Sequence, residues 1–136
     1  MNNTLSLIIG LILTFIILST VRKIILNIRS KGKFKNININ DAVSIYQNNK
    51  DVGLIDVRSY GEVQQSGYIK NSINIALDDS KFDEKISKLD KNKEYIVYCA
   101  SGSRSYMACI RMYKLGFTNI NNLTRAGYFQ LNSLLK

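Results

Sequence analysis

An uncharged apolar segment near the N-terminus constrains this chain more than any other feature. Residues 4–21 contain no Lys, Arg, Asp or Glu and are rich in Leu and Ile, and residues 24–26 extend the apolar run. A transmembrane helix needs about 20 predominantly apolar residues, whereas a helix in a soluble core normally keeps a polar face. We therefore expect a membrane-spanning helix, with residues 4–26 in contact with lipid.

A cleaved signal peptide is the main alternative for this segment. Such a peptide begins with positively charged residues and ends in a small-residue cleavage site. Here the first seven residues carry no charged side chain, and Arg22-Lys23 follows the apolar run instead of an Ala-x-Ala pattern. The sequence therefore favours an anchor that stays in the membrane.

The charges are unevenly placed along the chain, which has 19 Lys and Arg, ten Asp and Glu, and a formal net charge of +9. Six basic residues and no acidic residue lie just after the apolar run: Arg22, Lys23, Arg29, Lys31, Lys33 and Lys35. Flanks rich in Lys and Arg stay in the cytoplasm, so we expect a single-pass protein of the cell membrane whose folded domain faces the cytoplasm. The same flank can contact anionic headgroups. The remaining charges are nearly balanced, and no nucleic-acid partner is expected.

The length predicts one folded domain with an appendage. We place the transmembrane anchor at residues 1–28, a basic linker with Gly32 at residues 29–36, and the folded domain at residues 37–136. A domain of this size is large enough to bury a single core.

Short apolar runs alternate with helical patterns in the folded domain. Buried strands are predicted at residues 53–57, 73–76, 95–99 and 120–123. Helices are predicted at residues 42–46 (after Asn40 or Asp41 as the cap), 59–65, 82–89 and 105–115. This alternation indicates an α/β fold, a small and largely parallel sheet flanked by helices. Such sheets bind ligands at the carboxyl ends of their strands.

The cysteine and histidine content limits the possible chemistry. The chain has two cysteines, Cys99 and Cys109, and no histidine. A zinc site built on histidine and a Ser-His-Asp triad are therefore excluded, and two cysteines do not make a disulfide scaffold. We expect neither a metal nor a cofactor.

The loop after the strand at residues 95–99 has the pattern of a nucleophilic site. Cys99 ends the strand, small residues follow, and a helix then begins. Backbone N–H groups, the helix N-terminus and the Arg104 guanidinium would all favour the thiolate, which is the reactive form of cysteine. Cys99 is the predicted catalytic residue. The predicted substrate-binding residues are Ala100, Ser101, Gly102, Ser103, Arg104 and Ser105.

Other interpretations exist for these residues. A cysteine at a strand end can be an inert core residue, and Cys109 is interpreted in that way because it lies on the apolar face of the following helix. Asp56, Arg58 and Glu62 surround another strand end, where charged residues most often pair with one another. We assign these three residues a structural role around the site.

The loop Cys99-x-x-Gly102-x-Arg104-Ser105 resembles the active-site loop of the rhodanese family. Further segments resemble other markers of that family in the same order: residues 54–58, 62, 67–69, 72–75, 115–117 and 119–123. Two departures are that Tyr68 stands in place of a histidine and that Ala126-Gly127 stands near the position of paired glycines.

The resemblance implies a sulfurtransferase. Cys99 would accept sulfane sulfur as a persulfide from a donor such as thiosulfate or a protein persulfide, and would pass it to a thiophilic acceptor. Two alternatives stay open. The domain could be a persulfide carrier or a partner-binding module at the membrane. It could also be a cysteine phosphatase or arsenate reductase, but those loops place five residues between Cys and Arg, and only four intervene here.

Overall fold

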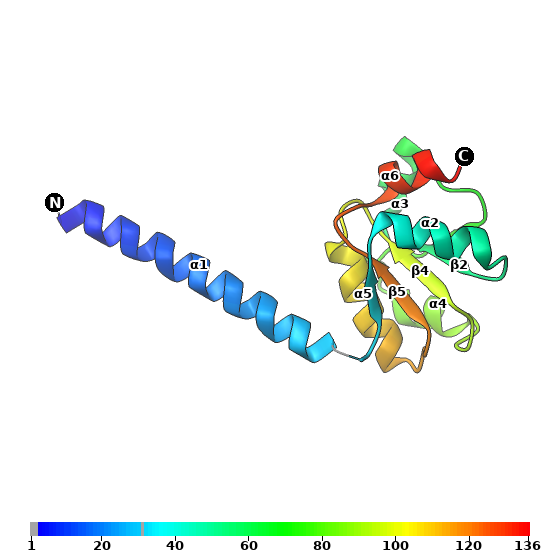
Figure 1. The fold of residues 1–136 in the computed structure, drawn as a ribbon, viewed down its shortest axis with the longest axis horizontal. Coiled ribbons are helices and arrows are strands. Elements are labelled where there is room, and N and C mark those ends of the chain that lie inside the picture. Colours follow the sequence, from blue (N-terminus) through cyan, green and yellow to red (C-terminus); the bar gives the residue numbers. More distant parts are fainter. Residues whose placement is uncertain (1–2, 31) are drawn as a thin grey trace. The chain divides into compact units, whose positions relative to one another are not determined.

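The computed structural model describes residues 3–30 and 32–136, which form two compact units divided after residue 31 (Figure 1). The first unit is helix α1 (Asn3–Ser30). Its window Thr4–Arg22 is 19 residues long, has a mean hydropathy of 2.5 and is not buried in the protein. That length and composition suit both a membrane anchor and a signal sequence.

The second unit is an all-parallel sheet with helices on both faces. Its strands are β1 (Lys35–Ile37), β2 (Gly53–Asp56), β3 (Ser72–Asn74), β4 (Tyr95–Tyr98) and β5 (Ile120–Leu123). Its helices are α2 (Ile39–Asn48), α3 (Tyr60–Ser66), α4 (Phe82–Ser87), α5 (Ser103–Lys114) and α6 (Tyr128–Leu134). The strand order is β1-β5-β4-β2-β3, which places β4 at the centre. The predicted α/β fold is therefore confirmed.

The two faces of the sheet bury separate apolar clusters, because successive side chains of a strand point to opposite sides. In β4, Val97 packs with residues of α4 and α5, whereas Ile96 packs with residues of α2 and α6. Every residue of β2, β4 and β5 is buried, as expected for a parallel sheet covered on both faces. This packing holds the end of β4 in a fixed position.

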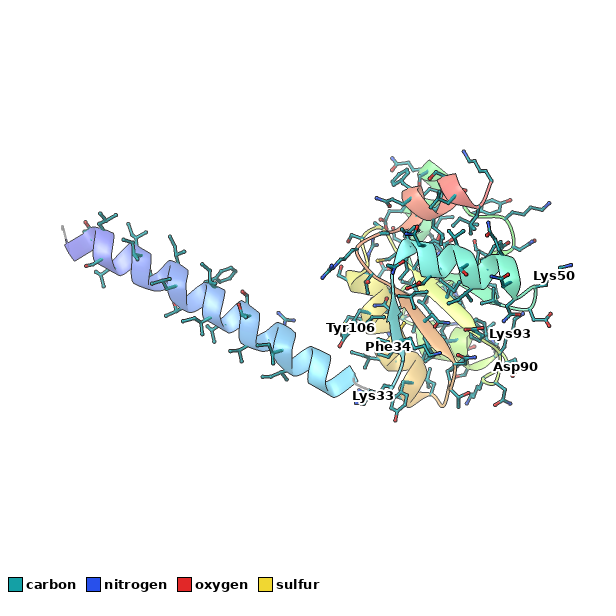
Figure 2. The ribbon with its side chains drawn as sticks, viewed as in Figure 1. Lys33, Phe34, Lys50, Asp90, Lys93 and Tyr106 are labelled. Carbon is teal, nitrogen blue, oxygen red and sulfur yellow. The ribbon has the colours of Figure 1, made fainter. Side chains whose placement is uncertain are left out.

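The folded unit takes in residues just before Ile37. The edge strand β1 begins at Lys35 and pairs in parallel with β5. The Phe34 ring packs edge-to-face on Tyr106, with 5.3 Å between ring centroids (Figure 2). Part of the segment 29–36, which was predicted as a linker, therefore forms a strand and contributes to the core.

Candidate active site

Cys99 is the first residue after β4, at the carboxyl edge of the central strand. The residues from Cys99 to Ser105 form one loop and the first turn of α5, so the predicted substrate-binding residues all lie together. Gly102 has φ +102°, a conformation that favours glycine. A Cβ on Gly102 would also lie only 3.1 Å from the carbonyl oxygen of Leu123. Gly102 is therefore required for the turn that brings α5 back toward the sulfur.

The sulfur of Cys99 is surrounded by hydrogen-bond donors. The Gly102 N–H donates to Cys99 Sγ over 3.1 Å, and Ser105 Oγ lies 3.8 Å from the same sulfur. Burial raises the pKa of Cys99, but hydrogen bonds from the backbone N–H groups of Ser105, Ser101 and Gly102 outweigh this effect. The net pKa lies below the ordinary value for cysteine, which favours the thiolate.

Cys109 differs from Cys99 in its hydrogen bonding rather than in its exposure. Both cysteines are 0% exposed. Cys109 lies on the buried face of α5 with Ala108 and Met112, and burial raises its pKa well above the ordinary value. Only Cys99 combines a strand end with converging N–H donors, so the pKa values of the two thiols shift in opposite directions even though both are buried.

Arg104 and Glu62 form a bidentate ion pair beside the loop. The two terminal nitrogens of Arg104 donate to the two carboxylate oxygens of Glu62 at 2.5 and 2.7 Å. The hydrogen bonds from Arg104 lower the pKa of Glu62 to about 2. Glu62 also accepts from the Ser59 N–H and so caps α3. Arg104 is one of the predicted substrate-binding residues, and this ion pair links the first turns of α3 and α5.

Asp56 and Arg58 form a buried ion pair at the end of β2. Arg58 Nη2 lies 2.7 Å from Asp56 Oδ2, and the two side chains are 2% and 0% exposed. The same guanidinium donates to Ser66 Oγ and to the Gly67 carbonyl, and it stacks 3.7 Å from the centre of the Tyr128 ring. A buried charge needs such partners to offset its desolvation. These contacts support the structural role expected for Asp56 and Arg58.

The segment between β5 and α6 packs against the cysteine loop, which the sequence did not indicate. The Tyr128 N–H donates to the carbonyl oxygen of Cys99 over 2.8 Å. A Cβ on Gly127 would lie only 2.0 Å from the carbonyl oxygen of Ala100, so glycine is the residue that fits. The resemblance of Ala126-Gly127 to the paired glycines of the family was the one available signal.

The fold and the cysteine loop together define a class of proteins. An all-parallel α/β domain presents a cysteine at the carboxyl end of its central strand, and backbone N–H groups favour the thiolate. Within the described residues, no group of three or more His, Cys, Asp or Glu side chains could hold a metal ion. The class is an α/β domain with a cysteine at the carboxyl end of its central strand whose thiolate form is favoured.

Comparison with known proteins identifies the family within that class. The model of the rhodanese-like domain matches residues 41–130. A sulfurtransferase of Allochromatium vinosum is 31% identical over 74 residues, which cover 54% of this chain and 66% of the relative. A rhodanese domain-containing protein of Drosophila melanogaster is 39% identical, over 54% of this chain and 76% of the relative. The crystal structure of a rhodanese-related protein from Thermoplasma volcanium matches with 33% identity and a TM-score of 0.56, over 73% of this chain and 90% of the other.

The chain therefore belongs to the rhodanese-like domain family. The match takes in the end of β4, the cysteine loop and the segment between β5 and α6. The chain spans just under two thirds of the length of the Allochromatium sulfurtransferase.

Proposed function

We propose that this chain is a sulfurtransferase in which Cys99 carries the transferred sulfur as a persulfide. The observation that supports this most directly is the 3.1 Å contact from the Gly102 N–H to Cys99 Sγ, in a loop whose other N–H groups also lower the pKa of that thiol. A thiolate held in this way is nucleophilic, and the same N–H groups suit the negative terminal sulfur of a persulfide.

The reaction proceeds in two transfers. The Cys99 thiolate attacks the sulfane sulfur of thiosulfate, forms a new S–S bond and releases sulfite, which leaves with the electron pair of the bond that breaks. A thiophilic acceptor, such as cyanide or a thiolate, then attacks the terminal sulfur of the persulfide and restores the Cys99 thiolate. A protein persulfide can replace thiosulfate as donor in the same scheme. The residues from Ala100 to Ser105 bind the transferred group through their backbone N–H groups.

The spacing of the loop favours sulfur transfer over phosphoryl transfer. Four residues separate Cys99 from Arg104, and both guanidinium terminal nitrogens bind Glu62. A loop of this length leaves less room than one that must surround a tetrahedral oxyanion.

The first test measures the substrate class with the full chain in detergent micelles. We expect thiosulfate and cyanide to yield thiocyanate over many turnovers, and we expect no hydrolysis of an aryl phosphate. A persulfide that forms on the protein but yields no thiocyanate would instead indicate a carrier for a specific partner. Phosphatase turnover without sulfur transfer would contradict the proposal.

We also propose that α1 is a membrane anchor and that the folded unit faces the cytoplasm. Arg22 is the last residue of the apolar window, and the helix continues from there to Ser30. The sequence around Arg22 does not have the small-residue pattern of a cleavage site. The basic residues at positions 22–35 favour the cytoplasmic side and suit anionic headgroups. The proposed anchor is residues 1–28, and the basic segment 29–36 leads into the domain at residues 37–136 and supplies the first two residues of β1.

The topology is tested with exposed cysteines, since both native thiols are buried. Two variants are made in a chain that also carries Cys99→Ser. Asp51→Cys places a cysteine on the exposed surface of the folded unit, and Thr4→Cys places one at the N-terminal end of the apolar run. In intact cells, a membrane-impermeant maleimide should label Thr4→Cys and should label Asp51→Cys only after lysis. Strong labelling of Asp51→Cys in intact cells, or loss of the N-terminal helix from the mature protein, would contradict this proposal.

A further inference from the structure

Arg125 has a backbone conformation that is unusual for its residue type. It lies between β5 and α6 and has φ +56°, in the left-handed region. A side chain in that region costs about 1 kcal/mol, which glycine would avoid. Such a conformation next to a reactive cysteine loop points to a role for the side chain.

The backbone of Arg125 is held against the cysteine loop. The Arg125 nitrogen and the Thr124 Cα both lie 3.3 Å from the position that a Cβ on Gly102 would occupy. On one side, the Thr124 N–H donates to the carbonyl of Ile37 over 2.9 Å, and on the other side the Tyr128 N–H donates to Cys99. Arg125 is therefore fixed at the rim of the loop while its side chain stays exposed.

The other two arginines around the site are already engaged. Arg104 is paired with Glu62, and Arg58 is paired with Asp56 and buried. In contrast, the Arg125 side chain makes no hydrogen bond or ion pair with any residue that the structure describes. Among these three arginines, Arg125 is the one with free donors for a ligand.

We infer that Arg125 binds the anionic part of the sulfur donor and so determines the preference for a small oxyanion such as thiosulfate. This inference rests on the proposed sulfurtransferase function. The planar guanidinium can donate two parallel hydrogen bonds to the oxygens of the sulfonate group. The sulfane sulfur of the bound donor then meets the Cys99 thiolate. Sulfite then leaves with the electron pair of the donor S–S bond, and Arg125 contacts its oxygens as it contacted those of the bound donor.

The test compares three variants of Arg125 in the full chain, in detergent micelles, with thiosulfate as donor and cyanide as acceptor. Arg125→Gln should raise the KM for thiosulfate about tenfold and change kcat less than twofold, because it removes binding rather than chemistry. The same variant should raise the inhibition constant of sulfate by a similar factor. Arg125→Lys keeps the charge but lacks the planar guanidinium, so its KM for thiosulfate should lie between those of Arg125→Gln and the wild type.

Arg125→Gly separates a binding role from a structural one. Glycine relieves the left-handed conformation, so thermal stability should stay equal or rise while KM rises as in Arg125→Gln. The matched control is Lys50→Gln, which removes an exposed positive charge (Figure 2). Lys50 lies just before the amino end of β2, whereas Cys99 follows the carboxyl end of β4. This control should keep the wild-type KM.

The outcomes separate this inference from the proposed function. If the wild type transfers sulfur and Arg125→Gln behaves like Lys50→Gln, the assignment of Arg125 is wrong and the sulfurtransferase proposal stands. A rise in KM that appears only together with a loss of stability would likewise overturn the binding role. If the wild type forms no persulfide and transfers no sulfur, the proposed function itself fails.

Discussion

Replacing Cys99 with Ser is expected to abolish both sulfur capture and sulfur transfer. A hydroxyl cannot form the persulfide, and no other described side chain combines a thiol with converging N–H donors. Serine is nearly isosteric and can still accept the Gly102 N–H, so the fold should be retained. After incubation with thiosulfate, the wild type should gain the mass of one sulfur atom on Cys99, and Cys99→Ser should gain nothing.

Cys109→Ala is the matched control for this prediction, because it removes the other buried thiol. Cys109 lies in the core and its pKa is raised by burial, so the variant should keep the adduct and the transfer activity. The loss of a small buried group should lower the free energy of unfolding by only about 1 kcal/mol. An adduct that survives in Cys99→Ser, or disappears in Cys109→Ala, would show that the wrong nucleophile has been assigned.

The pH dependence of persulfide formation provides a second measurement on the same residue. The pKa of Cys99 is lowered by backbone N–H groups, so the rate should rise with pH and reach its plateau below the ordinary cysteine pKa. Glu62, with a pKa of about 2, stays ionised over this whole range, so the Arg104 pair does not change. A rate that rises only near the pKa of an ordinary or buried thiol would contradict the proposed role of the N–H groups.

The local features of the fold were predictable because they depend on neighbouring residues. The run that forms β4 is apolar throughout, β2 is apolar up to Asp56, and β5 begins with Ile120 and ends with Leu123. Ser59 and Glu62 form the capping box that starts α3. The edge strand β1 was missed because Ile37 is its one buried residue and basic and polar residues precede it. Helix α2 begins before the predicted cap, since the Asn38 side chain accepts from the Asp41 N–H.

The long-range contacts of the site could not be predicted from the sequence. The sequence placed Arg104 beside Cys99, but its partner Glu62 comes 42 residues earlier in the chain. Arg58 similarly reaches the Tyr128 ring across the fold. These pairs depend on how the strands are ordered in the sheet, which local patterns do not specify. Arg104, which the sequence assigned to substrate binding, is therefore paired with a carboxylate of the protein that its neighbouring residues do not indicate.

At Gly127, even a substitution by alanine is expected to lower the stability of the fold strongly. In Gly127→Ala, the new Cβ would lie 2.0 Å from the Ala100 oxygen and 2.5 Å from the Cys99 oxygen. Both obstacles are backbone atoms, so no side-chain rotation can relieve the overlap. The cysteine loop and the segment before α6 must separate, which breaks the hydrogen bond from the Tyr128 N–H to Cys99. We expect the free energy of unfolding to fall by about 3 kcal/mol or more.

Thermal unfolding and sulfur transfer together test this prediction. Because the Cys99 carbonyl is part of the contact, the folded fraction of Gly127→Ala should also lose transfer activity. Gly61→Ala is the control: Gly61 lies in α3, and a Cβ there would meet nothing within 4 Å. Gly61→Ala should leave transfer activity unchanged. It should raise the free energy of unfolding by up to about 1 kcal/mol, because alanine favours the helix more than glycine does. Wild-type stability and activity in Gly127→Ala would mean that the segment between β5 and α6 does not hold the Cys99 loop in place.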